Sequence, residues 1–106
     1  MRVSNALGVG FKEKVYENAL AIELKNAGLT VEQQQPISVT YMGIVVGDFI
    51  ADLLVNGIVI VELKAMREID EFHQAQILNY LKAAGLKIGL ILNFGTRKLG
   101  IKRMVV

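Results

Sequence analysis

The chain has 106 residues, of which 53% are hydrophobic, with a formal net charge of +2 and no cysteine. This size is typical of one domain with a single core, and the hydrophobic fraction is too high for a disordered chain. The lack of cysteine excludes disulfides and zinc–thiolate sites, and no run of about 18 uncharged apolar residues could cross a membrane. We expect a single cytoplasmic domain over residues 1–106, because no secretory signal is present.

The first helix is expected over residues 11–27. Apolar residues recur three or four positions apart in this segment, as is typical of an amphipathic helix, and Gly28 suits the position after its end. The preceding LGVG segment contains two glycines that can supply a bend, and the pattern assigns no secondary structure to residues 1–10.

Strand-like segments fill the middle of the chain. Residues 29–35 form the first of them, closed by Pro36, which lacks a backbone donor and marks the edge or start of a strand. Residues 37–41 alternate next, and a turn at 42–43 leads into residues 44–55. The pattern predicts an antiparallel meander of three or four strands.

A second helix is predicted over residues 70–84. Asp70 is a candidate N-cap, and Gly85 is a candidate residue after the helix end. Its expected apolar stripe consists of Ile77, Leu81 and Ala84. Residues 87–93 then read as a buried strand and residues 99–105 as a final strand, which gives a fold of the α/β or α+β class.

Charged residues interrupt the two apolar runs GDFIADLLV and IVIVELKA, which flank Asn56 and Gly57. These charges are Asp52, Glu62 and Lys64. Burying them would cost several kcal/mol unless they are paired, solvated or bound to a metal. They therefore mark either a decorated sheet edge or a functional site.

The length of the hairpin loop decides how these charges are placed. A two-residue loop at 56–57 would leave Asp52 and Glu62 on opposite faces of the sheet. A three-residue loop at 55–57 would place them on one face, with Asp52 opposite Ile60 and diagonal to Glu62. We favour the three-residue loop because it separates charged from apolar residues. The apolar face would then hold Phe49, Ala51, Leu53, Val55, Val59, Val61, Leu63 and Ala65.

Asp52 and Glu62 would provide two hard oxygen ligands of the kind that Mg²⁺ or Mn²⁺ prefers, with water and substrate phosphate completing the coordination. Lys64 would project to the same side, where its ammonium can act on the attacking water or offset charge on the phosphorus. A D…ExK pattern alone is also typical of a solvated strand end.

Both helices contain further motifs. Gly10, Glu13 and Tyr16 have the spacing GxxExxY, which presents a carboxylate and a phenol one turn apart. Gln76 and Tyr80 have the spacing QxxxY and share a helix face distinct from the apolar stripe. Without further information, Glu13 is an ordinary solvent-facing glutamate and Tyr16 a packing residue.

The segments GFKEKVY, DLLV…VELK and AQILNYLKAAGLKIGLILNFG together resemble the GxxExxY proteins, a family assigned to the PD-(D/E)xK nuclease superfamily. The QxxxY motif is similar to that of the RecB-type branch. The resemblance covers nearly the whole chain. It implies a restriction-endonuclease-like αβββαβ core, in which a mixed sheet is flanked by two helices.

The resemblance also implies a set of site residues. These are Glu13, Asp52, Glu62, Lys64, Gln76 and Tyr80. The three acids would hold one or two divalent ions, Mg²⁺ or Mn²⁺, and Lys64 would act on the nucleophilic water. Gln76 would orient that water or the lysine, and Tyr80 would support the site or contact the nucleic-acid backbone.

The predicted function is a metal-dependent nuclease that hydrolyses phosphodiester bonds in DNA or another nucleic acid. The alternative is a non-catalytic module that keeps the fold and binds nucleic acid or a protein partner, such as a helicase or a second subunit in a homodimer. A basic cluster near the C-terminus could meet phosphates or protect a strand edge from aggregation. It consists of Arg97, Lys98, Lys102 and Arg103.

Overall fold

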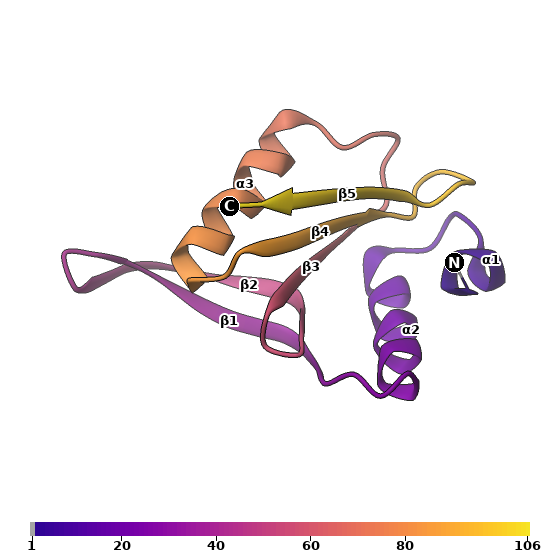
Figure 1. The fold of residues 1–106 in the computed structure, drawn as a ribbon. Coiled ribbons are helices and arrows are strands. Elements are labelled where there is room, and N and C mark those ends of the chain that lie inside the picture. Colours follow the sequence, from indigo (N-terminus) through magenta and orange to yellow (C-terminus); the bar gives the residue numbers. More distant parts are fainter. Residues whose placement is uncertain (1) are drawn as a thin grey trace.

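The computed structural model describes residues 2–106 as a five-stranded sheet with helices on both faces (Figure 1). The elements in chain order are α1 Arg2–Leu7, α2 Glu13–Asn26, β1 Val31–Tyr41, β2 Ile44–Val55, β3 Val59–Lys64, α3 Glu71–Ala84, β4 Ile88–Asn93 and β5 Gly100–Val105. The strand order in the sheet follows the sequence, and only β3 and β4 pair in parallel. The mixed sheet confirms the predicted fold class and the αβββαβ order of the core.

The helices start and end largely where the sequence predicts. Asp70 caps α3, because its Oδ1 accepts a hydrogen bond of 3.0 Å from the backbone N–H of His73. Gly85 ends α3 in the left-handed conformation with φ 71°, as expected for a terminal glycine. The short helix α1 was not predicted; it buries Val3 against the core.

The predicted break at Pro36 is wrong, because β1 runs without interruption from Val31 to Tyr41. Pro36 pairs with Ile50 of β2, and β1 is the edge strand of the sheet. An edge strand has one side without a neighbour, so a missing backbone donor is tolerated there. The meander therefore has three strands.

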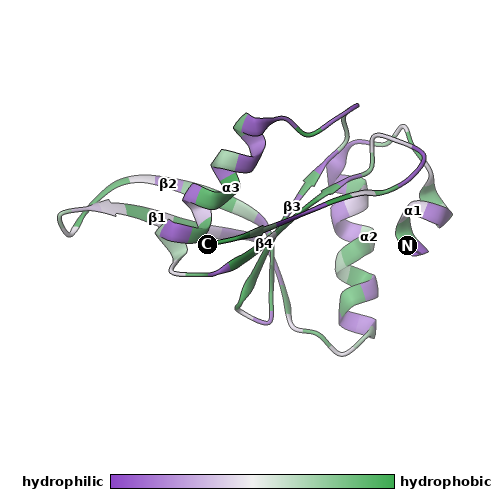
Figure 2. Cartoon of the chain, turned by 45° about the horizontal axis from the view of Figure 1, so that its top comes forward, coloured by the Kyte–Doolittle hydropathy of each residue, from purple (hydrophilic) through white to green (hydrophobic). Residues whose placement is uncertain are grey.

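The core consists of two apolar layers, one on each face of the sheet. The α2 layer contains Val3, Tyr16, Leu20, Ala21, Val31, Leu53, Val55, Val61, Leu63, Leu92 and Phe94. The α3 layer contains Ala51, Ile60, Ile77, Leu81 and Ile91. Figure 2 shows the corresponding pattern, with green apolar segments in the central strands and alternating green and purple along α2 and α3. No helix within residues 2–106 is long and apolar enough to cross a membrane.

The β2–β3 hairpin has a three-residue loop, as predicted, but its position is shifted by one residue. Val55 pairs with Val59, so the loop consists of residues 56–58. The loop is closed by the backbone N–H of Ile58, which donates to Val55 O at 3.1 Å, and Asn56 and Gly57 adopt positive φ within it. The predicted loop at 55–57 is corrected accordingly. Because the loop keeps three residues, moving it by one position leaves Asp52 and Glu62 on the same face.

The predicted apolar face of β2 is split between the two layers. Leu53 and Val55 pack in the α2 layer, whereas Ala51 packs in the α3 layer and Phe49 stacks on Tyr80 of α3. The ring centroids of Phe49 and Tyr80 are 3.6 Å apart. Regular alternation would have kept all four strand residues on one side. The strand therefore reverses its facing between Ala51 and Leu53, at Asp52.

The edge strand β1 reverses its facing at the matching point. Val31 lies in the α2 layer, whereas Ile37 packs against the α3 layer. Between them Gln34 has a left-handed φ of 53°, and the ladder pairs on either side skip both Gln34 and Asp52. A left-handed residue turns the following side chains to the other face, which explains the reversal. Asp52 is thereby left outside the β1–β2 ladder.

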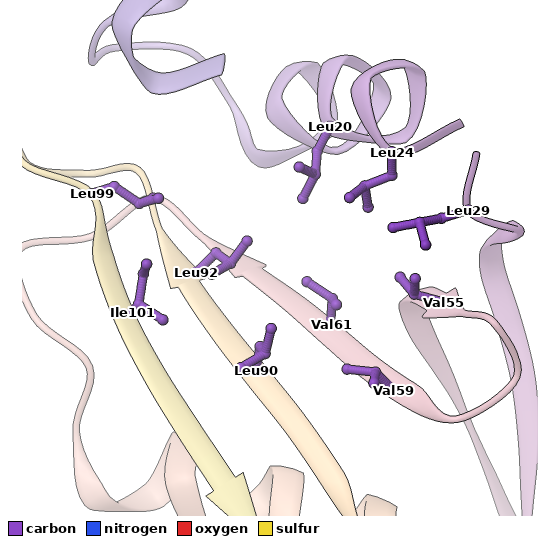
Figure 3. Close-up of a pocket in the computed structure, with 10 residues that line it drawn as sticks. All are labelled: Leu20, Leu24, Leu29, Val55, Val59, Val61, Leu90, Leu92, Leu99 and Ile101. Atoms are coloured by element: carbon purple, nitrogen blue, oxygen red, sulfur yellow. The ribbon is translucent and has the colours of Figure 1, made fainter. Parts of the chain in front are cut away.

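An apolar cavity of about 370 Å³ lies between α2 and the sheet (Figure 3). Its lining consists of Leu20, Leu24, Leu29, Val55, Val59, Val61, Leu90, Leu92, Leu99 and Ile101. All ten residues are aliphatic, so the cavity offers no group for acid–base or metal chemistry. The chemically competent residues lie on the opposite face of the sheet, toward α3.

Candidate active site

Two carboxylates meet where β2 and β3 diverge. The last β2–β3 ladder pair before the site is Leu53 with Val61, and the next position brings Asp52 opposite Glu62. There the side chains replace backbone pairing: Asp52 Oδ2 accepts from Leu63 N at 2.9 Å, and Glu62 Oε1 accepts from Asp52 N at 3.4 Å. The structure thus brings together the two acids that the D…ExK pattern predicts.

The pKa of Glu62 is raised to about 8. Burial is the largest cause, followed by repulsion from the Asp52 carboxylate and a side-chain hydrogen bond to it. The backbone N–H of Asp52 and the positive charge of Lys64 oppose this shift but do not cancel it. At neutral pH the pair therefore holds a proton in place of one negative charge.

Lys64 follows Glu62 on the same face of β3, at a half-buried position. Its charge acts on Glu62, yet it forms no salt bridge with a carboxylate within residues 2–106. An ammonium group that is half buried and has no ion-pair partner is available to a bound anion or to water. Lys64 thus lies where the sequence predicts it.

Tyr80 approaches the carboxylates from α3. Its pKa is raised by burial and then by the negative charges of Glu62 and Asp52, so its hydroxyl lies within their electrostatic reach. Gln76 lies one turn earlier on the same flank and is half-buried, beside the core residue Ile77. The helix α3 therefore presents the QxxxY residues beside its apolar stripe, as predicted.

Glu13 lies apart from this pair. It is the first residue of α2, is exposed, and belongs to the helix that covers the other face of the sheet. Within residues 2–106, no three acidic, histidine or cysteine side chains lie close enough to hold a metal ion together. The structure therefore assembles Asp52 and Glu62 but does not bring Glu13 to them.

Tyr16 of the GxxExxY motif is a core residue. Its ring is fully buried and stacks on Phe94 with centroids 4.5 Å apart. Its hydroxyl donates to Gly8 O at 2.7 Å and accepts from Phe11 N at 3.2 Å. The motif tyrosine thus fastens the loop before α2 to the core, in agreement with its interpretation as a packing residue.

Sequence reasoning missed Glu17, which is only 3% exposed. Its carboxylate accepts hydrogen bonds from Gln34 Nε2 at 2.6 Å, from Gln33 Nε2 at 2.7 Å and from Lys14 Nζ at 3.1 Å. Each hydrogen bond to a charged group stabilises the fold by about 1.5–3 kcal/mol. The left-handed backbone of Gln34 costs about 1–2 kcal/mol, which these bonds offset. The only sequence signal was position, because Glu17 follows the buried Tyr16 directly and precedes Leu20 by three residues.

Asn93 is a second residue that the motifs did not indicate. It is buried at the end of β4, and its side-chain amide donates to Met66 O at 2.8 Å while its Oδ1 accepts from Met66 N at 3.0 Å. Gly95 lies against the same segment, where an added Cβ would come within 2.2 Å of the Met66 backbone. These contacts fix the chain two residues after Lys64, at the end of the site strand.

A polar cavity of about 320 Å³ adjoins this end of the sheet. Lys64 pairs with Asn93 in the β3–β4 ladder, and Asn93 is one of the cavity residues. Arg67 and Lys102 contribute two positive charges to the lining, whereas Glu68 contributes one negative charge. The cavity therefore offers cationic and hydrogen-bonding groups one strand away from Lys64, although neither carboxylate lines it.

The carboxylate pair fits a divalent cation. Two acids share a partly buried place with two backbone donors, and the raised pKa of Glu62 shows that their negative charge is not fully compensated by the protein. Mg²⁺ is commonly bound through one or two carboxylates, with water and substrate phosphate as the other ligands. Asp52 and Glu62 are thus oxygen donors of the type that such an ion takes from a protein.

Comparison with known proteins identifies the family. The crystal structure of SSO0001 superimposes with a TM-score of 0.63 at 15% identity, covering 87% of this chain and 48% of that one. The present chain thus spans about half of that protein, and the likeness concerns the fold alone. No curated protein matches significantly. A family model described as the PD-(D/E)XK nuclease superfamily matches residues 1–104. The chain belongs to the PD-(D/E)XK nuclease superfamily.

Proposed function

We propose that the chain is a divalent-metal-dependent nuclease that hydrolyses phosphodiester bonds in DNA. The observation that supports this best is the meeting of Asp52 and Glu62 at the divergence of β2 and β3, with Lys64 on the same face. The motifs around these residues favour the GxxExxY branch of the superfamily and a RecB-like QxxxY helix.

Asp52 and Glu62 would hold Mg²⁺ or Mn²⁺, and Glu62 would lose its proton on binding. Such an ion supplies Lewis acidity and positive charge for the phosphate oxygens. In the reaction, a water oxygen forms a bond to phosphorus and one ester P–O bond breaks, with a proton passing from the water to the leaving oxygen. Lys64 would orient the water or stabilise charge on the phosphorus through its ammonium.

The α3 residues would assist from the other side. Gln76 would hold the attacking water or Lys64 through its side-chain amide. The Tyr80 hydroxyl would donate a hydrogen bond to a carboxylate or a phosphate oxygen. The raised pKa keeps the Tyr80 hydroxyl protonated, and a protonated hydroxyl can donate. The additional acid Glu13 stays a prediction from the family pattern.

Contacts to the nucleic-acid backbone would come from the polar cavity. Arg67 and Lys102 would bind phosphates next to the scissile one, since phosphate contacts position a nucleic acid without reading its sequence. Replacing Lys102 by alanine should weaken DNA binding and reduce its salt dependence by about one counterion.

The test is cleavage of plasmid and single-stranded DNA with Mg²⁺, with Mn²⁺ and with a chelator. The wild type should cleave only with metal, and Lys64→Ala should lower the rate by about 10²–10³-fold. Lys82→Ala is the matched control, because Lys82 is an exposed lysine in the last turn of α3. Equal activity of Lys64→Ala and Lys82→Ala would refute the role of Lys64. Binding of Mn²⁺ and DNA without cleavage would favour a non-catalytic module.

A further inference from the structure

A buried carboxylate outside the candidate site is connected to it through the edge strand. Glu17 of α2 receives three hydrogen bonds, and two of the donors are the neighbouring side chains of Gln33 and Gln34. Both glutamines are therefore held on the α2 side of the sheet. In a regular strand, adjacent side chains point to opposite faces, so this arrangement needs an irregular backbone.

The irregularity is the left-handed Gln34, with φ 53°. Asparagine, aspartate and glycine favour this conformation, whereas glutamine has no local reason to adopt it. The hydrogen bond of 2.6 Å from Gln34 Nε2 to Glu17 Oε1 supplies the missing stabilisation. Glu17 thus stabilises the left-handed backbone conformation of Gln34.

This conformation determines the pairing of Asp52. The β1–β2 ladder pairs Gln33 with Leu53 and Gln35 with Ala51 but skips the position between them. Freed from β1, Asp52 turns to β3, where its carboxylate accepts from Leu63 N and its N–H donates to Glu62. The hairpin register sets Asp52 opposite Glu62, and the skipped β1 position leaves the Asp52 N–H and carboxylate to bond with β3.

We propose that Glu17 is a positioning residue for the candidate site: by holding Gln34 in the left-handed conformation, it keeps Asp52 out of the β1 ladder, so that the Asp52 carboxylate accepts from Leu63 N beside Glu62. The inference concerns the geometry of Asp52 and rests on the proposed function only for its consequence in metal binding. Glu17 touches neither the substrate nor the carboxylate pair.

The test is amide hydrogen exchange of the metal-free protein at Leu63, whose N–H donates to Asp52. In Glu17→Gln, the new side-chain NH₂ must face one of the glutamine donors and cannot accept its hydrogen bond. The hold on Gln34 is then weakened, and we expect the protection of the Leu63 amide to fall about tenfold relative to that of Ile91 in β4. Glu23→Gln is the control, since Glu23 is another α2 carboxylate and forms an ion pair with the exposed Arg2. Unchanged relative protection of Leu63 in Glu17→Gln would overturn the proposal.

A rescue variant separates positioning from a general loss of stability. Glycine adopts positive φ freely, so adding Gln34→Gly to Glu17→Gln should restore the relative protection of Leu63. A merely structural role of Glu17 would leave the double variant as poorly protected as Glu17→Gln, which would refute the proposal. If Glu17→Gln alone folds poorly, the double variant is compared with the wild type instead.

Calorimetric titration with Mn²⁺ gives the second readout. We expect Glu17→Gln to bind about tenfold more weakly than wild type and the double variant to recover. Wild-type protein that binds no Mn²⁺ would refute the proposed function, while the exchange data would still decide the role of Glu17. Normal Mn²⁺ affinity in Glu17→Gln would refute its effect on the site.

Discussion

Glu17 is buried and Glu62 is half-buried, and the groups around the two carboxylates differ. On the α2 face, Glu17 receives hydrogen bonds from two amides and an ammonium. On the α3 face, Glu62 receives one long hydrogen bond from Asp52 N and lies against a second carboxylate. The fold satisfies the first charge and leaves the second without sufficient donors.

This difference separates structural from chemical roles. A buried charge with enough donors stabilises the local fold and has nothing left to bind. A buried carboxylate pair without them costs stability, and a cation can compensate for that cost. Substituting the two glutamates should therefore have opposite effects on stability, and the effects on activity should differ in size.

The largest expected effect is that of Glu62→Gln on DNA cleavage. Losing one of two carboxylate ligands should lower the rate by about 10³-fold or more, because the ion contributes several kcal/mol to charge stabilisation. Glu17→Gln should lower it only about tenfold, through misplacement of Asp52. The rates are compared in a plasmid-nicking assay at saturating Mn²⁺, and equal losses for both variants would remove the distinction.

The pH dependence of stability should show the cost of the carboxylate pair. Because folding raises the pKa of Glu62 from 4.5 to about 8, the folded state binds more protons than the unfolded state in this range. The free energy of unfolding should therefore fall by about 3–5 kcal/mol as the pH rises from 4.5 to 8 without metal. Urea unfolding at several pH values measures it. In Glu62→Gln the slope should nearly disappear, and a retained slope would place the titrating group elsewhere.

Glu17→Gln should destabilise the protein by about 2–3 kcal/mol, since one donor loses its charged acceptor. Urea unfolding in a Glu62→Gln background isolates this effect from the titration of Glu62. Glu23→Gln provides the baseline, with a change within about 0.5 kcal/mol expected for a surface ion pair. A Glu17→Gln protein as stable as the baseline variant would show that its hydrogen bonds contribute nothing net.

The smallest effect is expected for Glu13→Gln. Its side chain is exposed and lies apart from Asp52 and Glu62, so Mn²⁺ affinity should change by less than about threefold and stability by less than about 0.5 kcal/mol. Titration calorimetry checks the affinity. A loss comparable to that of Asp52→Asn would restore Glu13 to the ligand set that the family pattern implies.

The strands and long helices could be predicted from the sequence because periodicity, glycines and the Asp70 cap are local signals. Glu62 and Lys64 could be placed together for the same reason, since alternation in one strand fixes their common face. The convergence of Asp52 with Glu62 followed from the parity of the hairpin loop, although the loop itself lies one residue later.

The reversal at Gln34 and Asp52 could not be predicted, because it depends on a contact with Glu17, 17 positions away from Gln34 in the sequence. Regular alternation placed Phe49 and Ala51 on the wrong face for that reason. The motif GxxExxY likewise drew attention to Glu13, whereas the buried acid of the helix is one turn later. Local patterns identify helix faces only approximately, and tertiary hydrogen bonds decide which acid is buried.

The most direct test of the metal site is proton release on Mn²⁺ binding. Titration calorimetry at pH 7 in buffers of different ionisation enthalpy should show about one proton released per ion, because the pKa of Glu62 is about 8 and a ligand must be deprotonated. The release should fall toward zero above pH 9, and Asp52→Asn should abolish binding. Absence of Mn²⁺ binding, or binding without proton release that persists in Asp52→Asn, would contradict the assignment of Asp52 and Glu62 as the metal site.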